Sequence, residues 1–206
     1  MNEIKKRWDD RYSEKTYAYG ILPNEFLKSR LDKIEPSNIL FPAEGEGRNA
    51  VYAASLGWNV SAFDISSEGQ KKANLLASQN NVTIDYRIDA FEEIGYKENQ
   101  FDVIALIYAH FPPSIKSTYH KKLDNYLKPG GLIILEGFSK KNLVLREKNP
   151  KIGGPNDINF LFSIEEINAD FPNYDIIELE EKEVELNEGL YHIGRGAVVR
   201  FVGRKK

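Results

Sequence analysis

Cysteine is absent from this 206-residue sequence, which excludes disulfides, thiol catalysis and cysteine-ligated metal sites. No apolar run approaches the length of about 18 residues that a membrane-spanning helix needs. The N-terminus, MNEIKKRWDDRYSEK, also lacks the apolar segment of a secretory signal. Neither sign of charge dominates, since 28 lysines and arginines face 31 aspartates and glutamates. This balance offers no electrostatic footprint for nucleic acid or an anionic membrane, so we expect a soluble, cytoplasmic protein.

The remaining composition is that of a globular protein. Hydrophobic residues make up 41% and aromatic residues 12% of the chain, enough to build a core rather than a disordered chain. The length suits one sizeable α/β domain, and no repeat, low-complexity stretch or linker divides it. We therefore expect a single domain over residues 1–206.

Apolar runs and helix-like stretches alternate through the first two thirds of the chain. The predicted strands are Asn38–Phe41, Asn59–Phe63, Val82–Ile88, Phe101–Tyr108 and Leu132–Leu135. The stretches of helical composition are Arg48–Leu56, Glu68–Ser78 and Ser114–Leu127, after which Pro129-Gly130-Gly131 is expected to stop the helix and start a strand. This alternation predicts a parallel sheet covered on both faces. Two later strand-like runs, Asp175–Leu186 and Tyr191–Val202, flank a turn signal and predict a closing antiparallel hairpin.

The stretch FPAEGEGRNA, residues 41–50, is typical of a glycine turn that opens a helix. Its part GEGRNA fits the fingerprint G-x-G-x-x-[G/A], in which glycine allows a tight turn and close approach of a ligand. Asp64 follows the next predicted strand, 19 residues after Gly45, at the offset of an acid that binds ribose hydroxyls. The alternative is an ordinary turn followed by a helix-capping aspartate. Strand, turn, helix and acid together favour a nucleoside ligand.

Two glutamates in this turn distinguish between nucleoside ligands. A unit charge at about 4 Å is worth on the order of 4 kcal/mol near a protein surface, so Glu44 and Glu46 would oppose a pyrophosphate unless Arg48 offsets one of them. The same carboxylates would attract the ammonium and sulfonium groups of S-adenosylmethionine. We expect Glu44 to face this cationic end and Glu46 to point to solvent.

A third predicted strand end carries Asp89-Ala90-Phe91. Asp89 could bind the exocyclic amine of adenine, or it could cap a helix that begins at Glu92. In an open α/β sheet ligands bind at the carboxyl ends of the strands, where the glycine turn, Asp64 and Asp89 all lie.

Six segments in order resemble a class I S-adenosylmethionine-dependent methyltransferase, nearest the tellurite-resistance and thiopurine methyltransferase group. The segments are WDDRYSEKTYAYGILPNEFL, AEGEGRNAVYAASLGWNVSAFDIS, IDAFE, FDVIALIYAHFPP, LKPGGLIILEGFS and EGLYHIGRGAVVRFVGRKK. The resemblance implies a three-layer Rossmann-like sandwich whose seven-stranded, mostly parallel sheet ends in an antiparallel strand. It also implies that residues 1–34 cover the cofactor. The sequence departs from the family at Phe41, where an acidic residue is usual, and at Ala43, where the first glycine is usual.

These considerations define the expected site. The expected cofactor contacts are Tyr19, Ala43, Glu44, Gly45, Asn49, Asp64, Ile65, Asp89, Ala90 and Tyr108. Methyl transfer from a sulfonium needs alignment of the acceptor, and a base only if the acceptor carries a proton. Tyr108 and His110, after the fourth strand, are the candidate catalytic residues, although His110 could equally be a loop-packing residue. Further candidates are Glu136, Phe138, His192 and Arg195, whereas His120 is interpreted as part of a solvated helix face.

The expected function is methyl transfer to a small-molecule acceptor by a monomer, without nucleic-acid or membrane partners. An NAD-dependent oxidoreductase that uses GEGRNA and a non-catalytic cofactor-binding module remain as alternatives. No histidine or carboxylate cluster has metal-ligand spacing, so no metal is expected. Residues 139–162 have no clear period, which is typical of a functional or mobile loop.

Overall fold

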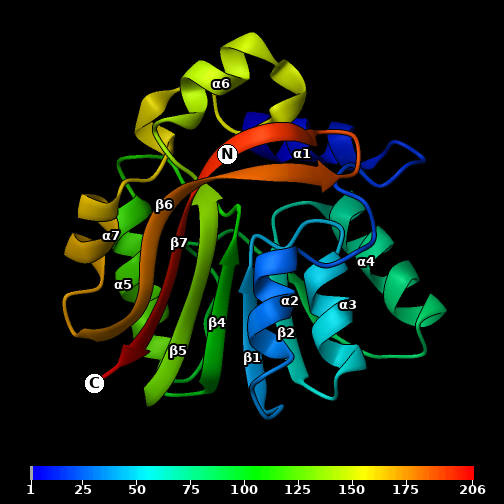
Figure 1. Cartoon of the computed structure of the whole chain (residues 1–206). Helices are drawn as coiled ribbons and strands as arrows, with labels where there is room; N and C mark the ends of the chain where they lie inside the picture. The colour runs from blue at the N-terminus through cyan, green and yellow to red at the C-terminus, as the bar shows by residue number, and fades with distance from the viewer. Residues whose placement is uncertain (1) are drawn as a thin grey trace. The chain divides into compact units, whose positions relative to one another are not determined.

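The computed structural model describes residues 2–206 and divides into two compact units. We call them the N-terminal unit, Met1–Gly95 with Glu188–Leu190, and the C-terminal unit, Tyr96–Asn187 with Tyr191–Lys206. Each is described by itself (Figure 1). The elements of the N-terminal unit are α1 (Asn2–Tyr12), α2 (Glu25–Leu31), β1 (Asn38–Pro42), α3 (Arg48–Ser55), β2 (Asn59–Asp64), α4 (Ser67–Gln79) and β3 (Asp85–Ile88).

Local signals explain where the helices of the N-terminal unit begin. The Asn24 side chain accepts a hydrogen bond from the Leu27 amide at the start of α2, and the Ser66 side chain does the same for the Gly69 amide at the start of α4. Gly47, with φ of 85°, precedes α3. In β1, Ile39, Leu40 and Phe41 are fully buried, as expected for a parallel strand covered on both faces.

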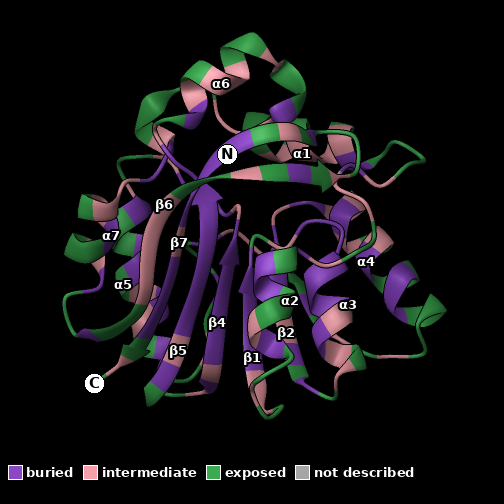
Figure 2. Ribbon diagram, viewed as in Figure 1, coloured by how far each residue is buried: buried purple, intermediate pink, exposed green. Residues whose placement is uncertain are grey.

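The C-terminal unit begins with β4 (Phe101–Ile107), α5 (Lys116–Tyr126) and β5 (Leu127–Phe138). It continues with α6 (Asn142–Lys148), the 3₁₀ turns η1 (Pro150–Ile152) and η2 (Ile158–Phe160), and α7 (Ile164–Asp170). The last two strands are β6 (Tyr174–Glu188) and β7 (His192–Lys205). The apolar runs in β4 and β5 are buried, and both strands are drawn largely purple in Figure 2.

One local expectation for the C-terminal unit was wrong, and another was incomplete. Pro129-Gly130-Gly131 does not separate helix from strand, because β5 already begins at Leu127 and includes these residues. Residues 139–162, expected to be a functional or mobile loop, contain three short elements that were not predicted, α6, η1 and η2. Elements as short as these contain too few residues for a helical period to show in the sequence.

The seven strands form one sheet in the order β3-β2-β1-β4-β5-β7-β6. Strand β2 pairs in parallel with β1 and β3, β4 pairs in parallel with β5, and β7 runs antiparallel to β5 from Leu132↔Arg204 to Phe138↔Val198. This arrangement confirms the predicted Rossmann-like fold with an antiparallel ending. Within residues 2–206, no helix is both long and apolar enough to cross a membrane.

Candidate cofactor site

The glycine turn directly after β1 takes a left-handed backbone at three positions. Ala43, Gly45 and Gly47 have φ of 52°, 63° and 85°. A Cβ on Gly45 would lie 2.6 Å from the Tyr12 hydroxyl oxygen, and one on Gly47 would lie 2.5 Å from the Ala73 Cβ. Both glycines are therefore required by close approach as well as by φ, whereas Ala43 carries the strain of a non-glycine residue in this region.

Glu44 turns its carboxylate onto the N-terminus of α3. Its Oε1 accepts hydrogen bonds from the Asn49 amide at 2.9 Å and the Ala50 amide at 2.8 Å. Burial raises the pKa of Glu44 to about 7, although these amides and Arg48 act in the opposite direction. The amides with which a helix N-terminus would hold a phosphate are thus already bonded to a carboxylate.

Glu46 is buried, so the expectation that it points to solvent was wrong. Only 5% of the residue is exposed. Its Oε2 accepts the Ala18 amide at 2.7 Å, and the Lys72 ammonium donates to its Oε1 at 2.7 Å. The reason is that the N-terminal segment folds back over the turn, a long-range contact that the local pattern does not reveal. Glu46 therefore fixes the chain near Ala18.

Arg48 is also engaged within the N-terminal unit. Its guanidinium donates to the carbonyl oxygens of Tyr19 at 3.3 Å and Leu22 at 3.4 Å, and to the Glu188 carboxylate at 3.0 Å. The guanidinium therefore forms hydrogen bonds with protein groups. Its charge nevertheless lowers the pKa of Glu44, so Arg48 offsets that glutamate in part.

Asp64 lies at the end of β2 and is 7% exposed. Its Oδ2 accepts the Gly45 amide at 3.0 Å and its Oδ1 accepts the Ser66 amide at 2.9 Å. Burial raises its pKa to about 6, against the effect of these backbone hydrogen bonds. Since Ser66 is the N-cap of α4, Asp64 is not the helix cap that the alternative interpretation required. It joins the glycine turn to the end of β2.

Helix α1 supplies contacts that the sequence analysis did not assign. The Tyr12 ring lies against Gly45 and Gly69, and Asp9 accepts a hydrogen bond from the Ser66 hydroxyl at 2.6 Å. The Tyr86 hydroxyl, from β3, donates to the Gly45 carbonyl oxygen at 2.6 Å. The resemblance implied that residues 1–34 cover the cofactor, but it did not show which of their side chains face the turn.

The other expected cofactor residues of this unit have the following surroundings. The Asp89 amide donates to the Asp64 carbonyl oxygen at 3.1 Å, which extends the β2–β3 pairing. The Ala90 carbonyl oxygen accepts the amides of Glu93 and Ile94 in a turn, so no helix begins after Asp89. Asn49 accepts the Asn24 amide at 2.9 Å. Ile65 is half-buried beside Asp64, and the Tyr19 hydroxyl accepts a hydrogen bond from Arg11 at 2.7 Å.

In the C-terminal unit, Tyr108 follows β4 with a left-handed φ of 53°. Such strain in a bulky residue is typical of functional positions. Its hydroxyl donates to Glu136 Oε1 at 3.2 Å, and the Arg200 guanidinium donates to Glu136 Oε2 at 2.6 Å. The Tyr108 ring centre lies 4.8 Å from that of Phe138 and 4.4 Å from that of His192. A buried ion pair and two rings thus fix the phenol, whereas Arg195 forms an exposed ion pair with Glu183.

His110 uses both ring nitrogens in local hydrogen bonds. Its Nδ1 lies 3.0 Å from the Phe160 carbonyl oxygen, and its Nε2 accepts the Phe138 amide at 3.1 Å. These partners require a neutral ring with the proton on Nδ1, and burial lowers the pKa of His110 to about 4. A role as base would require one of these bonds to break. The geometry matches the loop-packing alternative.

His120 is fully buried, so its assignment to a solvated helix face was wrong. Its Nδ1 lies 2.6 Å from Asp170 Oδ2, and its ring stacks on Phe171 with centres 5.2 Å apart. The run Ser-Thr-Tyr-His-Lys-Lys looked hydrophilic, but Tyr119, His120 and Leu123 form the inner face of α5. His120 is a packing residue.

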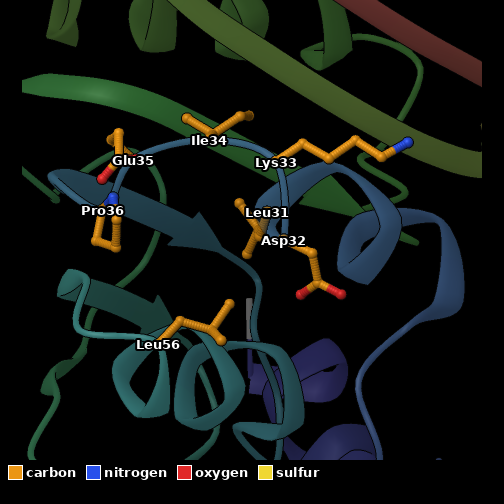
Figure 3. A pocket seen from close by; sticks show the side chains of 7 residues that line it. All are labelled: Leu31, Asp32, Lys33, Ile34, Glu35, Pro36 and Leu56. Carbon is orange, nitrogen blue, oxygen red and sulfur yellow. The ribbon is translucent and has the colours of Figure 1, made fainter.

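A small hollow of the N-terminal unit lies away from these residues. Figure 3 shows its lining of Leu31, Asp32, Lys33, Ile34, Glu35, Pro36 and Leu56. These residues precede β1 and end α3, whereas the glycine turn follows β1 at its other end. The hollow is therefore not part of the candidate site. Within residues 2–206, no three histidine, aspartate or glutamate side chains are grouped to hold a metal ion.

Comparison with known proteins relates part of this chain to methyltransferases. Residues 39–131 match a family model described as a methyltransferase domain. A ubiquinone biosynthesis O-methyltransferase from Xanthomonas oryzae pv. oryzae is 26% identical over an alignment of 142 residues that covers 66% of this chain and 58% of that protein. The chain spans less than two thirds of the length of the curated relatives it matches.

Solved structures show the same fold. TehB from Haemophilus influenzae superposes with a TM-score of 0.69 at 17% identity, covering 98% of this chain and 67% of that one. A Burkholderia thailandensis 1,6-didemethyltoxoflavin-N1-methyltransferase, solved with S-adenosylhomocysteine bound, gives 0.61 at 18% identity, covering 87% and 75%. The family match thus relates residues 39–131 to a methyltransferase domain, and the solved structures share the fold of this chain.

Proposed function

We propose that this protein transfers a methyl group from S-adenosylmethionine to a small-molecule acceptor. The observation that carries the proposal is the position of Glu44, whose carboxylate accepts the Asn49 and Ala50 amides at the N-terminus of α3. A dinucleotide places its pyrophosphate on the amides of such a helix. Here it would have to displace a carboxylate, while a cationic sulfonium ligand would not. The alternative of an NAD-dependent oxidoreductase is disfavoured for this reason.

Asp64 is proposed to hold the ribose. Its two oxygens, already oriented by the Gly45 and Ser66 amides, retain lone pairs for two hydroxyl groups. Tyr19, Ala43, Gly45, Asn49, Ile65, Asp89, Ala90 and Tyr108 are the further proposed cofactor contacts. Tyr19 lies on a segment that Glu46 and Arg48 fix in place.

Tyr108 is proposed to contact the acceptor. Transfer forms a bond from the acceptor atom to the methyl carbon and breaks the bond from that carbon to sulfur, so the main task is alignment. The phenol donates a hydrogen bond to the Glu136 carboxylate, so its oxygen can accept a hydrogen bond from a hydroxyl or amine of the substrate. Two curated relatives, named as methyltransferases of ubiquinone biosynthesis and of a phytyl hydroquinone, favour phenolic acceptors. We also propose that the protein belongs to the tellurite-resistance and thiopurine methyltransferase group. It is proposed to be a single-domain, monomeric protein of the cytoplasm.

Turnover tests this function. S-adenosylhomocysteine formation is measured by chromatography with a catechol, a hydroquinone, an alkyl thiol and tellurite as candidate acceptors. We expect product with at least one of them. With that acceptor, Tyr108→Phe should lower kcat/KM about tenfold, the loss of a hydrogen bond worth about 1.4 kcal/mol.

The matched control is Tyr52→Phe. The Tyr52 hydroxyl accepts a hydrogen bond from the Lys28 ammonium on the surface of the N-terminal unit. This variant should retain wild-type turnover. Tight binding of S-adenosylmethionine without turnover of any acceptor would instead favour the non-catalytic cofactor-binding module.

A further inference from the structure

The turn between β6 and β7 belongs to the N-terminal unit. The Leu190 amide donates to the Ala18 carbonyl oxygen at 2.8 Å. A Cβ on Gly189, which has φ of 63°, would lie 2.4 Å from the Gly20 amide nitrogen. The two backbones are therefore in direct contact, and only glycine fits at the tip of this turn.

Glu188 adds a buried charge to this contact. Its Oε2 accepts the Arg48 guanidinium at 3.0 Å, and its Oε1 accepts the Asn24 side-chain amide at 3.0 Å. The Arg48 and Glu188 side chains are only 8% and 12% exposed. Buried pairs of this kind depend strongly on both partners, because removal of one leaves the other charge uncompensated. We call Asn24, Arg48 and Glu188 the hairpin lock.

The hairpin lock fixes a segment that carries a proposed cofactor contact. Arg48 donates to the carbonyl oxygens of Tyr19 and Leu22, so it holds both ends of the bend around Gly20. Asn24 is held from α3 through Asn49 and caps α2 with its own side chain. Residues 18–24 are consequently fixed between the N-terminus of α3 and the turn that follows Glu188. Glu188 is 164 positions away from Asn24 in the sequence.

We propose that Glu188 is a positioning residue for the cofactor and acts through Arg48 on the segment of residues 18–24. This inference rests on the proposed function, since the site it serves is the S-adenosylmethionine site. Glu188 holds Arg48 in the orientation that keeps residues 18–24 in the conformation competent to bind. Without its charge, the competent fraction of the protein falls and the apparent affinity falls in proportion.

The test compares Glu188→Gln with Glu185→Gln, a matched change at an exposed position of the same strand. Calorimetry is done with S-adenosylmethionine at a temperature where each variant is fully folded. We expect about tenfold weaker binding for Glu188→Gln and an unchanged dissociation constant for Glu185→Gln. Glu188→Asp, which keeps the charge, should recover a substantial part of the affinity, a rescue that general destabilisation would not produce.

Hydrogen exchange without ligand provides an independent readout. Amides of residues 18–24 should exchange faster in Glu188→Gln, while those of α5 should not change. In an Arg48→Met background, Glu188→Gln should have no further effect on either measurement. Wild-type affinity together with wild-type exchange in Glu188→Gln would overturn the inference. If the wild type itself failed to bind S-adenosylmethionine, the proposed function would be overturned, and the exchange result would still report on the hairpin lock.

Discussion

Asp64→Asn should bind S-adenosylmethionine ten- to hundredfold more weakly than the wild type. The substitution removes a charged acceptor from two ribose hydroxyls, and hydrogen bonds to charged groups are worth about 1.5–3 kcal/mol. It also replaces one of the two oxygens that accept the Gly45 and Ser66 amides. The glycine turn therefore loses one of its fixed contacts, which adds to the loss of affinity.

Asp85→Asn is the control for this change, because Asp85 is an exposed residue at the start of β3. It should leave the dissociation constant unchanged. Calorimetry on folded protein gives both values, with thermal melting as the check on folding. Wild-type affinity in a folded Asp64→Asn variant would remove Asp64 from the cofactor site.

The affinity for S-adenosylmethionine should rise steeply between pH 5.5 and pH 8. Burial raises the pKa of Asp64 to about 6 and that of Glu44 to about 7, so both carboxyl groups titrate in this window. A cationic ligand favours the ionised forms. If binding requires a carboxylate, affinity falls roughly tenfold for each pH unit below its pKa. Binding near pH 6.5 should accordingly release protons.

Stability without ligand should respond to pH in the opposite direction. Carboxyl groups whose pKa is raised on folding hold their protons more tightly in the folded state. Their contribution to the free energy of unfolding is present below about pH 4, the range of their unfolded pKa values, and is lost as pH rises through about 6 to 7. Glu44→Gln should reduce this dependence.

Calorimetry in buffers of different ionisation enthalpy measures the proton release, and melting curves at several pH values measure the stability. The charge of Asp9, from α1, raises the pKa of Asp64, and the charge of Arg48, from α3, lowers that of Glu44. A pH-independent affinity for S-adenosylmethionine, with no proton release, would contradict the assigned roles of Asp64 and Glu44.

The sheet could be predicted from the sequence because its signals are local. Each parallel strand is a short apolar run, such as Asn38–Pro42, bounded by turn residues, and burial on both faces requires this pattern. The last two strands were found through the turn signal Asn187-Glu188-Gly189. The short helices after β5 were missed because they contain too few residues to show a period.

The candidate site was predictable where a residue follows a strand, and not where it depends on contacts between distant segments. Asp64 was placed at the end of β2 by its offset from Gly45. The burial of Glu46 by Ala18 and Lys72, and of His120 by Asp170, depends on residues between 26 and 50 positions away. A local pattern of charges cannot distinguish such residues from solvated ones.

Glu44 occupies the amides that a pyrophosphate would need, and we propose that the glycine turn accepts a cationic nucleoside instead. Direct titration of the wild type with S-adenosylmethionine and with NAD, by calorimetry at the same pH and salt concentration, tests it most directly. We expect saturable one-to-one binding of S-adenosylmethionine and no detectable binding of NAD. Binding of NAD with equal or greater affinity would contradict this proposal.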